Sequence, residues 1–151
     1  MILYLDASAL VKRYIAEAWT NDVEMVVGQA QLLGSGAISQ VEVTSALARA
    51  ARTKGLNQYT AQMALRAFHV QWADFIRLPV TDALLTRASD FAWQYGLRGY
   101  DAMHLAAACA WSDAIGSAVT LATFDRGLRQ ATPRVGLLAW PGDLPALLSA
   151  L

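Results

Sequence analysis

The sequence predicts an α/β fold: one α/β/α sandwich around a central, mainly parallel sheet of about five short strands. Short apolar runs alternate with longer stretches of helical periodicity, which is the pattern of parallel strands joined by helical crossovers. The chain of 151 residues has the length of one domain. No repeat, linker or low-complexity segment divides it. We therefore expect a single domain over residues 1–151.

The first half of the chain predicts two strands and four helices. Met1 to Leu5 is an apolar run typical of a strand buried on both faces. Ser8 is expected to cap the short helix that follows. The glycines of Gly34-Ser-Gly36 are interpreted as a helix break, and Gly55 as a helix stop. The expected elements are strand 1–5, helix 8–16, helix 20–33, strand 37–38, helix 39–54 and helix 57–75.

The second half predicts three more strands around an alanine-rich helix. Pro79 marks the first of these strands as an edge strand. Thr81 is expected to cap the next helix, and the loop Gly96–Gly99 separates it from the alanine-rich one. The expected elements are strand 76–80, helix 81–95, helix 100–113, strand 118–122, a helical turn over 124–130 and strand 135–139.

The composition excludes several classes of protein. Apolar residues make up 56% and charged residues 16%, which is too apolar for a long disordered region. Twelve basic and twelve acidic residues balance to zero net charge, so avid, non-specific nucleic-acid binding is not expected. The longest apolar run, Leu105 to Trp111, is too short to span a membrane. The single cysteine, Cys109, favours a reducing, cytoplasmic location.

Four acidic residues fall where strands end or the next helices begin. Asp6 closes the first strand, and Asp125 follows the strand expected over 118–122. Glu42 and Asp101 lie in the first turns of two helices. In an open parallel sheet these positions share one edge, which is where ligands bind. The four carboxylates are therefore candidates for a single site.

Structural roles for the same acids stay open at this point. Ser39-Gln-Val-Glu42 has the form of a capping box. Asp101 can balance a helix dipole, and Asp125 can cap a turn. Asp6 is the hardest to explain in this way, because a carboxylate that closes a buried strand needs a partner.

Carboxylates gathered in one pocket favour a divalent cation. Like charges repel one another, and a cation relieves that repulsion. Hard oxygen ligands without Cys or His select Mg²⁺ or Mn²⁺ over zinc. Such sites activate water for attack on a phosphodiester. Ser8 and Thr123 place hydroxyl groups at the same edge as auxiliary residues, with helix capping as the alternative role of Ser8.

Four segments resemble the hallmarks of the PIN-domain family, in particular its VapC-type toxins. They are Leu5-Asp-Ala-Ser-Ala-Leu-Val-Lys12, Ile38-Ser-Gln-Val-Glu42, Leu97-Arg-Gly-Tyr-Asp-Ala-Met-His-Leu-Ala106 and Ala122-Thr-Phe-Asp125. Their order and spacing match the family from Ile2 to about Leu138.

This resemblance implies a PIN fold and a metal-dependent ribonuclease. The quartet of Asp6, Glu42, Asp101 and Asp125 would hold Mg²⁺ or Mn²⁺, with Asp6 and Asp101 as the central ligands. Thr123 would lie beside the site as an auxiliary polar residue. The resemblance also implies a small antitoxin protein that holds the toxin inactive, and a homodimer.

Several basic residues and one histidine lie close to these acids in the sequence. Arg98, Arg126 and Lys12 are expected to contact RNA phosphates beside the one that is cleaved. The basic stretch Arg49–Lys54 is interpreted as a solvated helix face. His104, three residues after Asp101, is interpreted as a hydrogen-bonded structural residue.

The same fold class and acidic residues also occur with three other functions. An aspartyl-phosphate phosphatase needs a second aspartate two positions after Asp6, where this chain has Ser8. A receiver-like phosphoacceptor needs a lysine after a late strand, but the lysines are Lys12 and Lys54. An inactive PIN-like scaffold that binds RNA or protein is kept as the alternative.

Overall fold

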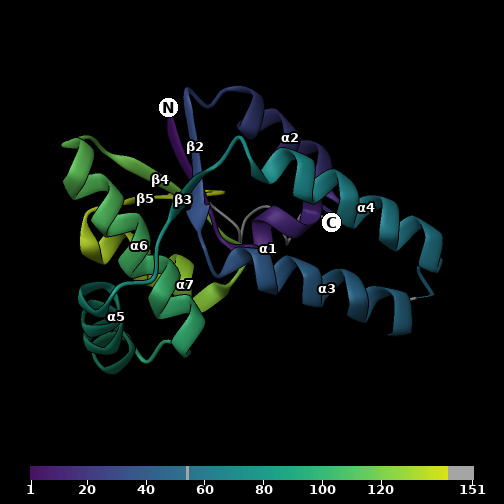
Figure 1. The fold of residues 1–151 in the computed structure, drawn as a ribbon. Coiled ribbons are helices and arrows are strands. Elements are labelled where there is room, and N and C mark those ends of the chain that lie inside the picture. Colours follow the sequence, from purple (N-terminus) through teal and green to yellow (C-terminus); the bar gives the residue numbers. More distant parts are fainter. Residues whose placement is uncertain (54, 143–151) are drawn as a thin grey trace.

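The computed structural model describes residues 1–53 and 55–142, and within them it forms one parallel sheet (Figure 1). All strand pairs are parallel, and the strand order is β3-β2-β1-β4-β5. The five-stranded sheet predicted from the sequence is confirmed. Its strands are β1 (Ile2–Leu5), β2 (Leu32–Gly36), β3 (Ile76–Leu78), β4 (Val119–Ala122) and β5 (Leu138–Trp140).

Helices cover both faces of this sheet, as the prediction of an α/β/α sandwich requires. One face carries α1 (Ala7–Leu10), α2 (Thr20–Gly28), α3 (Ser39–Thr53) and α4 (Gln58–Trp72), and the other carries α5 (Asp82–Tyr95), α6 (Gly99–Ile115) and α7 (Arg126–Ala131). The 3₁₀ segments are η1 (Val11–Arg13) and η2 (Thr132–Val135). Helices α3 and α4 project together to the right of the sheet in Figure 1.

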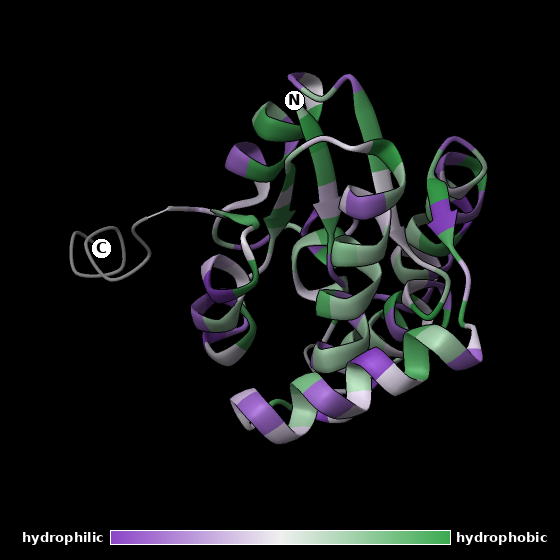
Figure 2. Cartoon of the chain, turned by 90° about the vertical axis from the view of Figure 1, so that its left-hand side faces the viewer, coloured by the Kyte–Doolittle hydropathy of each residue, from purple (hydrophilic) through white to green (hydrophobic). Residues whose placement is uncertain are grey.

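The alternation of side chains along β1 divides the core into two halves. Leu3 and Leu5 pack against the α1–α4 layer, whereas Tyr4 points into the α5–α7 layer. The middle of helix α6, from Ala102 to Trp111, is mostly buried, and its alanines let it lie close to the sheet. Figure 2 shows this helix in pale green through the middle of the molecule, with the more hydrophilic α5 across its outside. None of the helices in the described part has the length and apolar character of a membrane span.

The expected helix 20–33 and strand 37–38 are wrong in their boundaries, and the structure shows why. Helix α2 ends at Gly28, and residues 32–36 form β2. A Cβ at Gly34 would lie 2.7 Å from the Trp111 ring, and one at Gly36 would lie 2.8 Å from the Tyr4 hydroxyl. Both glycines therefore serve close packing inside a strand, and they do not break a helix.

The start of the first helix also differs from the expectation. Helix α1 begins at Ala7, and its N-cap is Asp6, whose carboxylate accepts the N–H of Ala9. Ser8 lies inside the helix, because a strand that ends in an aspartate already supplies a cap. The expected helix 8–16 is split into α1 and the 3₁₀ segment η1. Thr81 caps α5 as predicted. Lys54 and the end of the expected domain at 143–151 lie outside the described residues.

The strand order places a crevice at the carboxyl end of β1. The chain leaves β1 toward β2 and β3 on one side, whereas β4 and β5 lie on the other side. Such a reversal is the usual ligand-binding point of an open parallel sheet. Leu5 pairs with Ala122, so the residues that follow, Asp6 and Thr123, come side by side.

Candidate active site

A pocket of about 610 Å³ opens at this carboxyl edge of the sheet. The four predicted acids line it although they are far apart in the sequence: Asp6, Glu42, Asp101 and Asp125. They come from the end of β1, the first turn of α3, the first turn of α6 and the N-cap of α7. The structure therefore brings the whole predicted quartet to one cavity.

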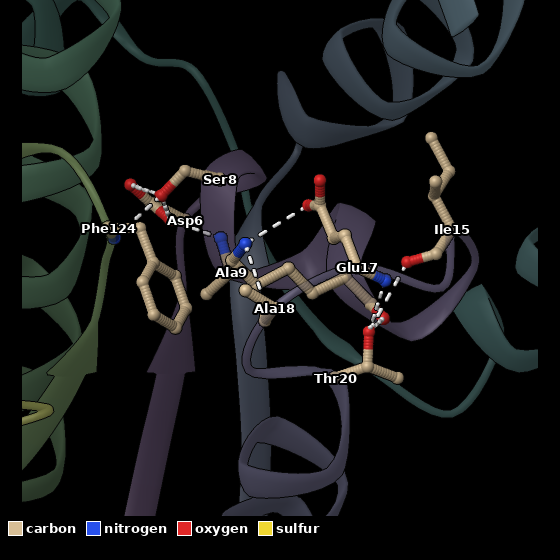
Figure 3. A network of polar contacts seen from close by, with 9 residues as sticks. Asp6, Ser8, Ala9, Ile15, Glu17, Ala18, Thr20 and Phe124 are labelled. Atoms are coloured by element: carbon tan, nitrogen blue, oxygen red, sulfur yellow. Dashed lines mark hydrogen bonds and ion pairs between the residues drawn. The ribbon is translucent and has the colours of Figure 1, made fainter. Parts of the chain in front are cut away.

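Asp6 is the most buried of the four acids and is held by three donors. Its side chain accepts the amide N–H of Ala9 at 2.9 Å, the hydroxyl of Ser8 at 2.7 and 2.9 Å, and the hydroxyl of Thr123 at 2.5 Å. Figure 3 shows Asp6, Ser8 and Phe124 in this network. Burial raises the pKa of Asp6, and these hydrogen bonds and the nearby His104 counteract the rise. The carboxylate is thus fixed in one orientation at the base of the pocket.

The hydroxyl groups of Ser8 and Thr123 bridge Asp6 and the segment that follows β4 by hydrogen bonds. Ser8 Oγ accepts the N–H of Phe124 at 2.8 Å, and Thr123 Oγ1 accepts the N–H of Asp125 at 3.0 Å. Each hydroxyl therefore has its own hydrogen left to donate to Asp6. Ser8 lines the pocket, whereas Thr123 is buried below it. Both residues adjoin the acids, as the sequence analysis expects.

Asp101 is the acid of the quartet whose ionised form is disfavoured by the charges of the other acids. Partial burial, followed by the negative charges of Asp125 and Asp6, raises its pKa to about 6. Arg98 and His104 oppose this rise. Repulsion among carboxylates of this kind is relieved by a bound cation or a proton.

Glu42 does not form the capping box that its spacing allowed. Its carboxylate Oε2 lies 2.8 Å from Nε2 of His104. Ser39, the other member of the expected box, is buried and exchanges a hydrogen bond with Ser35 at 2.7 Å. Glu42 is therefore turned toward α6 and the pocket, away from its own helix terminus.

Asp125 combines the two roles that the sequence left open. Its carboxylate accepts the N–H of Leu128 at 2.8 Å and so caps α7. It also lines the pocket and raises the pKa of Asp101. One oxygen can serve the helix while the other faces the cavity.

The predicted phosphate contacts divide into one that lies at the pocket and two that do not. Arg98 lines the pocket beside Asp101. The Lys12 ammonium group donates to Glu17 at 3.0 Å and to the carbonyl of Ala18 at 3.1 Å, and it lies over the Phe124 ring. Arg126 is exposed at the start of α7 and is not among the residues that line the cavity.

Two further residues of the pocket, Arg49 and Tyr100, carry charged or aromatic side chains and are not among the predicted site residues. Arg49 lines the pocket although it was interpreted as part of a solvated face. It stands seven residues after Glu42 on the same helix, a spacing that returns a side chain to the same face, so this signal was present. Tyr100 also lines the pocket and is 62% exposed. An aromatic ring this exposed beside an acidic cavity contributes little to the core.

The donor chemistry of the pocket fits a hard divalent cation. All four acids offer carboxylate oxygens, which suit Mg²⁺ and Mn²⁺. Burial and then the negative charges of Asp125 and Asp6 raise the pKa of Asp101, and a cation would offset both effects. In the arrangement seen, no three His, Cys, Asp or Glu side chains of residues 1–53 and 55–142 stand close enough together to form a ready metal cluster. A cation would therefore have to draw the carboxylates inward from the positions described.

A comparison with protein-family models matches the PIN domain over residues 3–132. The chain belongs to the PIN-domain family. This match spans β1 through the start of η2 and includes all four acids. The PIN fold expected from the four sequence segments is thereby confirmed.

Named relatives of this PIN domain come from Mycobacterium tuberculosis. Ribonuclease VapC45 and Ribonuclease VapC49 are each 30% identical to it over 143 residues, which covers 95% of this chain and 97% of theirs. The solved structure of FitAcB from Neisseria gonorrhoeae has a TM-score of 0.65 at 14% identity, covering 93% of this chain and 98% of that one. PAE2754 from Pyrobaculum aerophilum has a TM-score of 0.63 at 22% identity, covering 100% and 91%. The relatives are similar in sequence over almost the whole chain, and the solved structures share the fold.

Proposed function

We propose that this chain is a metal-dependent endoribonuclease whose active site is the acidic pocket. The observation that carries the proposal is the convergence of four carboxylates, from four separate segments, on one cavity at the carboxyl edge of the sheet. The relatives named Ribonuclease VapC, similar over almost the whole chain, support RNA as the substrate. The oxygen-only donor set supports Mg²⁺ or Mn²⁺ as the cofactor.

The four acids would hold the metal, with Asp6 and Asp101 as the central ligands. A divalent cation at such a site supplies positive charge for the phosphate and activates a water molecule. Asp6 contributes a carboxylate whose orientation Ser8 and Thr123 already fix. Asp101 contributes a carboxylate whose ionised form is disfavoured by burial and by the charges of Asp125 and Asp6, and a cation would offset this. A carboxylate of the pocket accepts the proton that the attacking water releases.

Basic and aromatic residues at the rim would bind the RNA strand. Arg98 and Arg49 line the pocket and offer positive charge to the phosphates on either side of the scissile one. The exposed ring of Tyr100 offers a flat surface for an unpaired base. In-line attack by water would leave a 5′-phosphate on one product.

The test is an RNA-cleavage assay with the purified chain. Cellular RNA is incubated with Mg²⁺ or Mn²⁺, or with chelator, and the fragment ends are analysed. The proposal requires discrete fragments with 5′-phosphates that depend on metal and are lost in Asp101→Asn. The matched control is Asp113→Asn, an exposed acid at the far end of the same helix. Products ending in 2′,3′-cyclic phosphate, or equal cleavage by Asp101→Asn, would contradict the proposal.

The alternative is an inactive PIN scaffold that binds RNA or a protein without cleaving it. Retention of all four acids in one pocket argues against this alternative. Specific RNA binding by the folded, metal-loaded chain without any cleavage would support it.

We further propose that the ribonuclease is the toxin of a toxin–antitoxin pair. A small antitoxin would hold it inactive, it would form a homodimer, and its location would be the cytoplasm. The resemblance to VapC-type toxins supports these points, and the single, buried Cys109 agrees with a reducing compartment. Co-purification with the product of a neighbouring small gene, and light scattering of the purified chain, test the partner and the dimer.

A further inference from the structure

A buried histidine joins the core of the molecule to the acidic pocket. His104 is 2% exposed and is hydrogen-bonded through both ring nitrogens. Its Nδ1 lies 2.8 Å from the hydroxyl of Tyr4, and its Nε2 lies 2.8 Å from the Glu42 carboxylate. The three side chains come from α6, β1 and α3. They form a polar chain that crosses from one half of the core into the pocket.

The hydrogen positions in this chain follow from the partners. A carboxylate can only accept, so Nε2 of His104 carries the hydrogen that faces Glu42. Complete burial raises the pKa of Tyr4 well above its ordinary value, so its hydroxyl keeps a hydrogen. That hydroxyl can donate to Nδ1 and thereby hold the ring in the Nε2–H form. Tyr4 also meets the ring edge-on, with centroids 5.8 Å apart.

The contact between Tyr4 and His104 depends on the space beside Gly36. A Cβ on Gly36 would lie 2.8 Å from the Tyr4 hydroxyl and 3.7 Å from His104 Nδ1. The absence of a side chain at Gly36 thus leaves the space in which the two polar groups meet. A purely structural hydrogen-bonded series would be buried at both ends. The series Tyr4–His104–Glu42 instead ends on the Glu42 carboxylate, which is 22% exposed and lines the pocket.

We propose that His104, oriented by Tyr4, is a positioning residue that holds the Glu42 carboxylate in the metal-binding arrangement and so sets the affinity of the pocket for Mg²⁺ or Mn²⁺. This inference rests on the proposed metal site. A histidine that orients a metal-binding carboxylate acts through its hydrogen bond, and loss of such outer partners weakens metal binding. His104 is not itself a ligand, because both of its ring nitrogens are already engaged.

The first test measures Mn²⁺ binding to the full chain by isothermal titration calorimetry. His104→Leu removes the hydrogen bond to Glu42, and we expect affinity to fall roughly 10- to 100-fold. His104→Gln keeps an N–H donor at a similar reach and should stay within about threefold of the unchanged chain. Cys109→Ala, a buried apolar change on the same helix, is the matched control and should not alter affinity.

A second variant guards against simple misfolding. His104→Leu leaves the buried Tyr4 hydroxyl without a partner, so it is also combined with Tyr4→Phe, which replaces the buried pair by apolar groups. Circular dichroism melts without metal report the fold. A folded double variant with weak Mn²⁺ binding supports the proposal, and one with unchanged binding overturns it.

A double-mutant cycle with Glu42→Gln isolates the link between the two residues. If His104 acts through Glu42, His104→Leu should cost no further affinity once the Glu42 charge is gone. Equal losses in both backgrounds would overturn the proposal. Cleavage provides a separate readout: saturating Mn²⁺ should restore kcat in His104→Leu, which it would not do for a purely structural defect.

These outcomes separate the inference from the proposed function. Mn²⁺ binding that depends on His104, without RNA cleavage, would sustain the inference and contradict the ribonuclease. Metal-dependent cleavage with Mn²⁺ affinity unaffected by His104→Leu would do the reverse. Failure of the unchanged chain to bind Mn²⁺ at all would overturn the inference.

Discussion

Thr123 donates its hydroxyl hydrogen to Asp6 at 2.5 Å, which joins the end of β4 to the end of β1. The two residues follow the paired positions Leu5 and Ala122, so parallel register alone sets them side by side. The same hydroxyl accepts the N–H of Asp125. One buried threonine therefore ties two of the four acids to each other and to the sheet.

Replacement of Thr123 by Val should weaken both stability and catalysis. Asp6 loses a donor and the Asp125 amide loses its acceptor, so we expect the free energy of unfolding to fall by about 2–3 kcal/mol. The Thr123 hydrogen bond lowers the pKa of Asp6, so its loss should move the acid limb of the pH–rate profile to higher pH. Chemical denaturation and initial rates between pH 5 and 8 measure the two effects.

Two further substitutions serve as controls for this change. Thr123→Ser keeps the hydroxyl and should retain most of the activity. Thr132→Val removes another buried hydroxyl, which donates only to the Leu128 carbonyl. It should leave the pH–rate profile unchanged. An identical profile for Thr123→Val would show that the hydroxyl does not influence Asp6.

The sequence was sufficient for the sheet and the quartet because both follow from local pattern. Apolar runs that end in acids define strands and their carboxyl edge, and parallel register does the rest. Strand β2 lies at 32–36, before its expected position at 37–38, because Gly34 and Gly36 are small for a tertiary reason, the approach of Trp111 and Tyr4. The link from Glu42 to His104 spans 62 positions, and a valid local capping pattern concealed it.

Asp101 should make the metal-free protein less stable. Its pKa is raised to about 6 in the folded chain, against an ordinary value of 3.8. Between these values the folded state holds a proton that the unfolded state has released, so stability falls as pH rises from about 4 to about 6. Above about pH 6 Asp101 is ionised in both states, so the folded chain is destabilised by the full free-energy cost of that charge.

Asp101→Asn should therefore abolish cleavage and yet stabilise the metal-free chain. At pH 7 we expect a gain of about 1 kcal/mol in the free energy of unfolding, after allowance for solvent screening of this half-buried group. The gain should be largely lost near pH 4, where Asp101 is protonated in the folded state and about half protonated in the unfolded state. Urea unfolding of both proteins at pH 4 and pH 7, with chelator present, measures it. A variant that is less stable at pH 7 would contradict the strain assigned to Asp101.

Arg98 should contribute to RNA binding more than exposed arginines elsewhere. It lines the pocket beside Asp101, so its loss removes positive charge from the path of the RNA strand. We expect Arg98→Ala to raise KM about tenfold and to reduce the salt dependence of binding. Arg66→Ala, on the exposed side of α4, is the matched control. Equal effects of the two substitutions would indicate a general effect of net charge.

Substitution of the two glycines of β2 distinguishes an effect on core packing from an effect on the metal-binding pocket. Gly34→Ala would place a Cβ 2.7 Å from the Trp111 ring, and Gly36→Ala would place one 2.8 Å from the Tyr4 hydroxyl. Each overpacks the interior, so we expect each to cost about 1–3 kcal/mol of stability. Only Gly36→Ala should also weaken Mn²⁺ binding, because it displaces Tyr4 from His104. Calorimetric titration of the two folded variants decides this, and equal Mn²⁺ affinities would show that the space beside Gly36 serves packing alone.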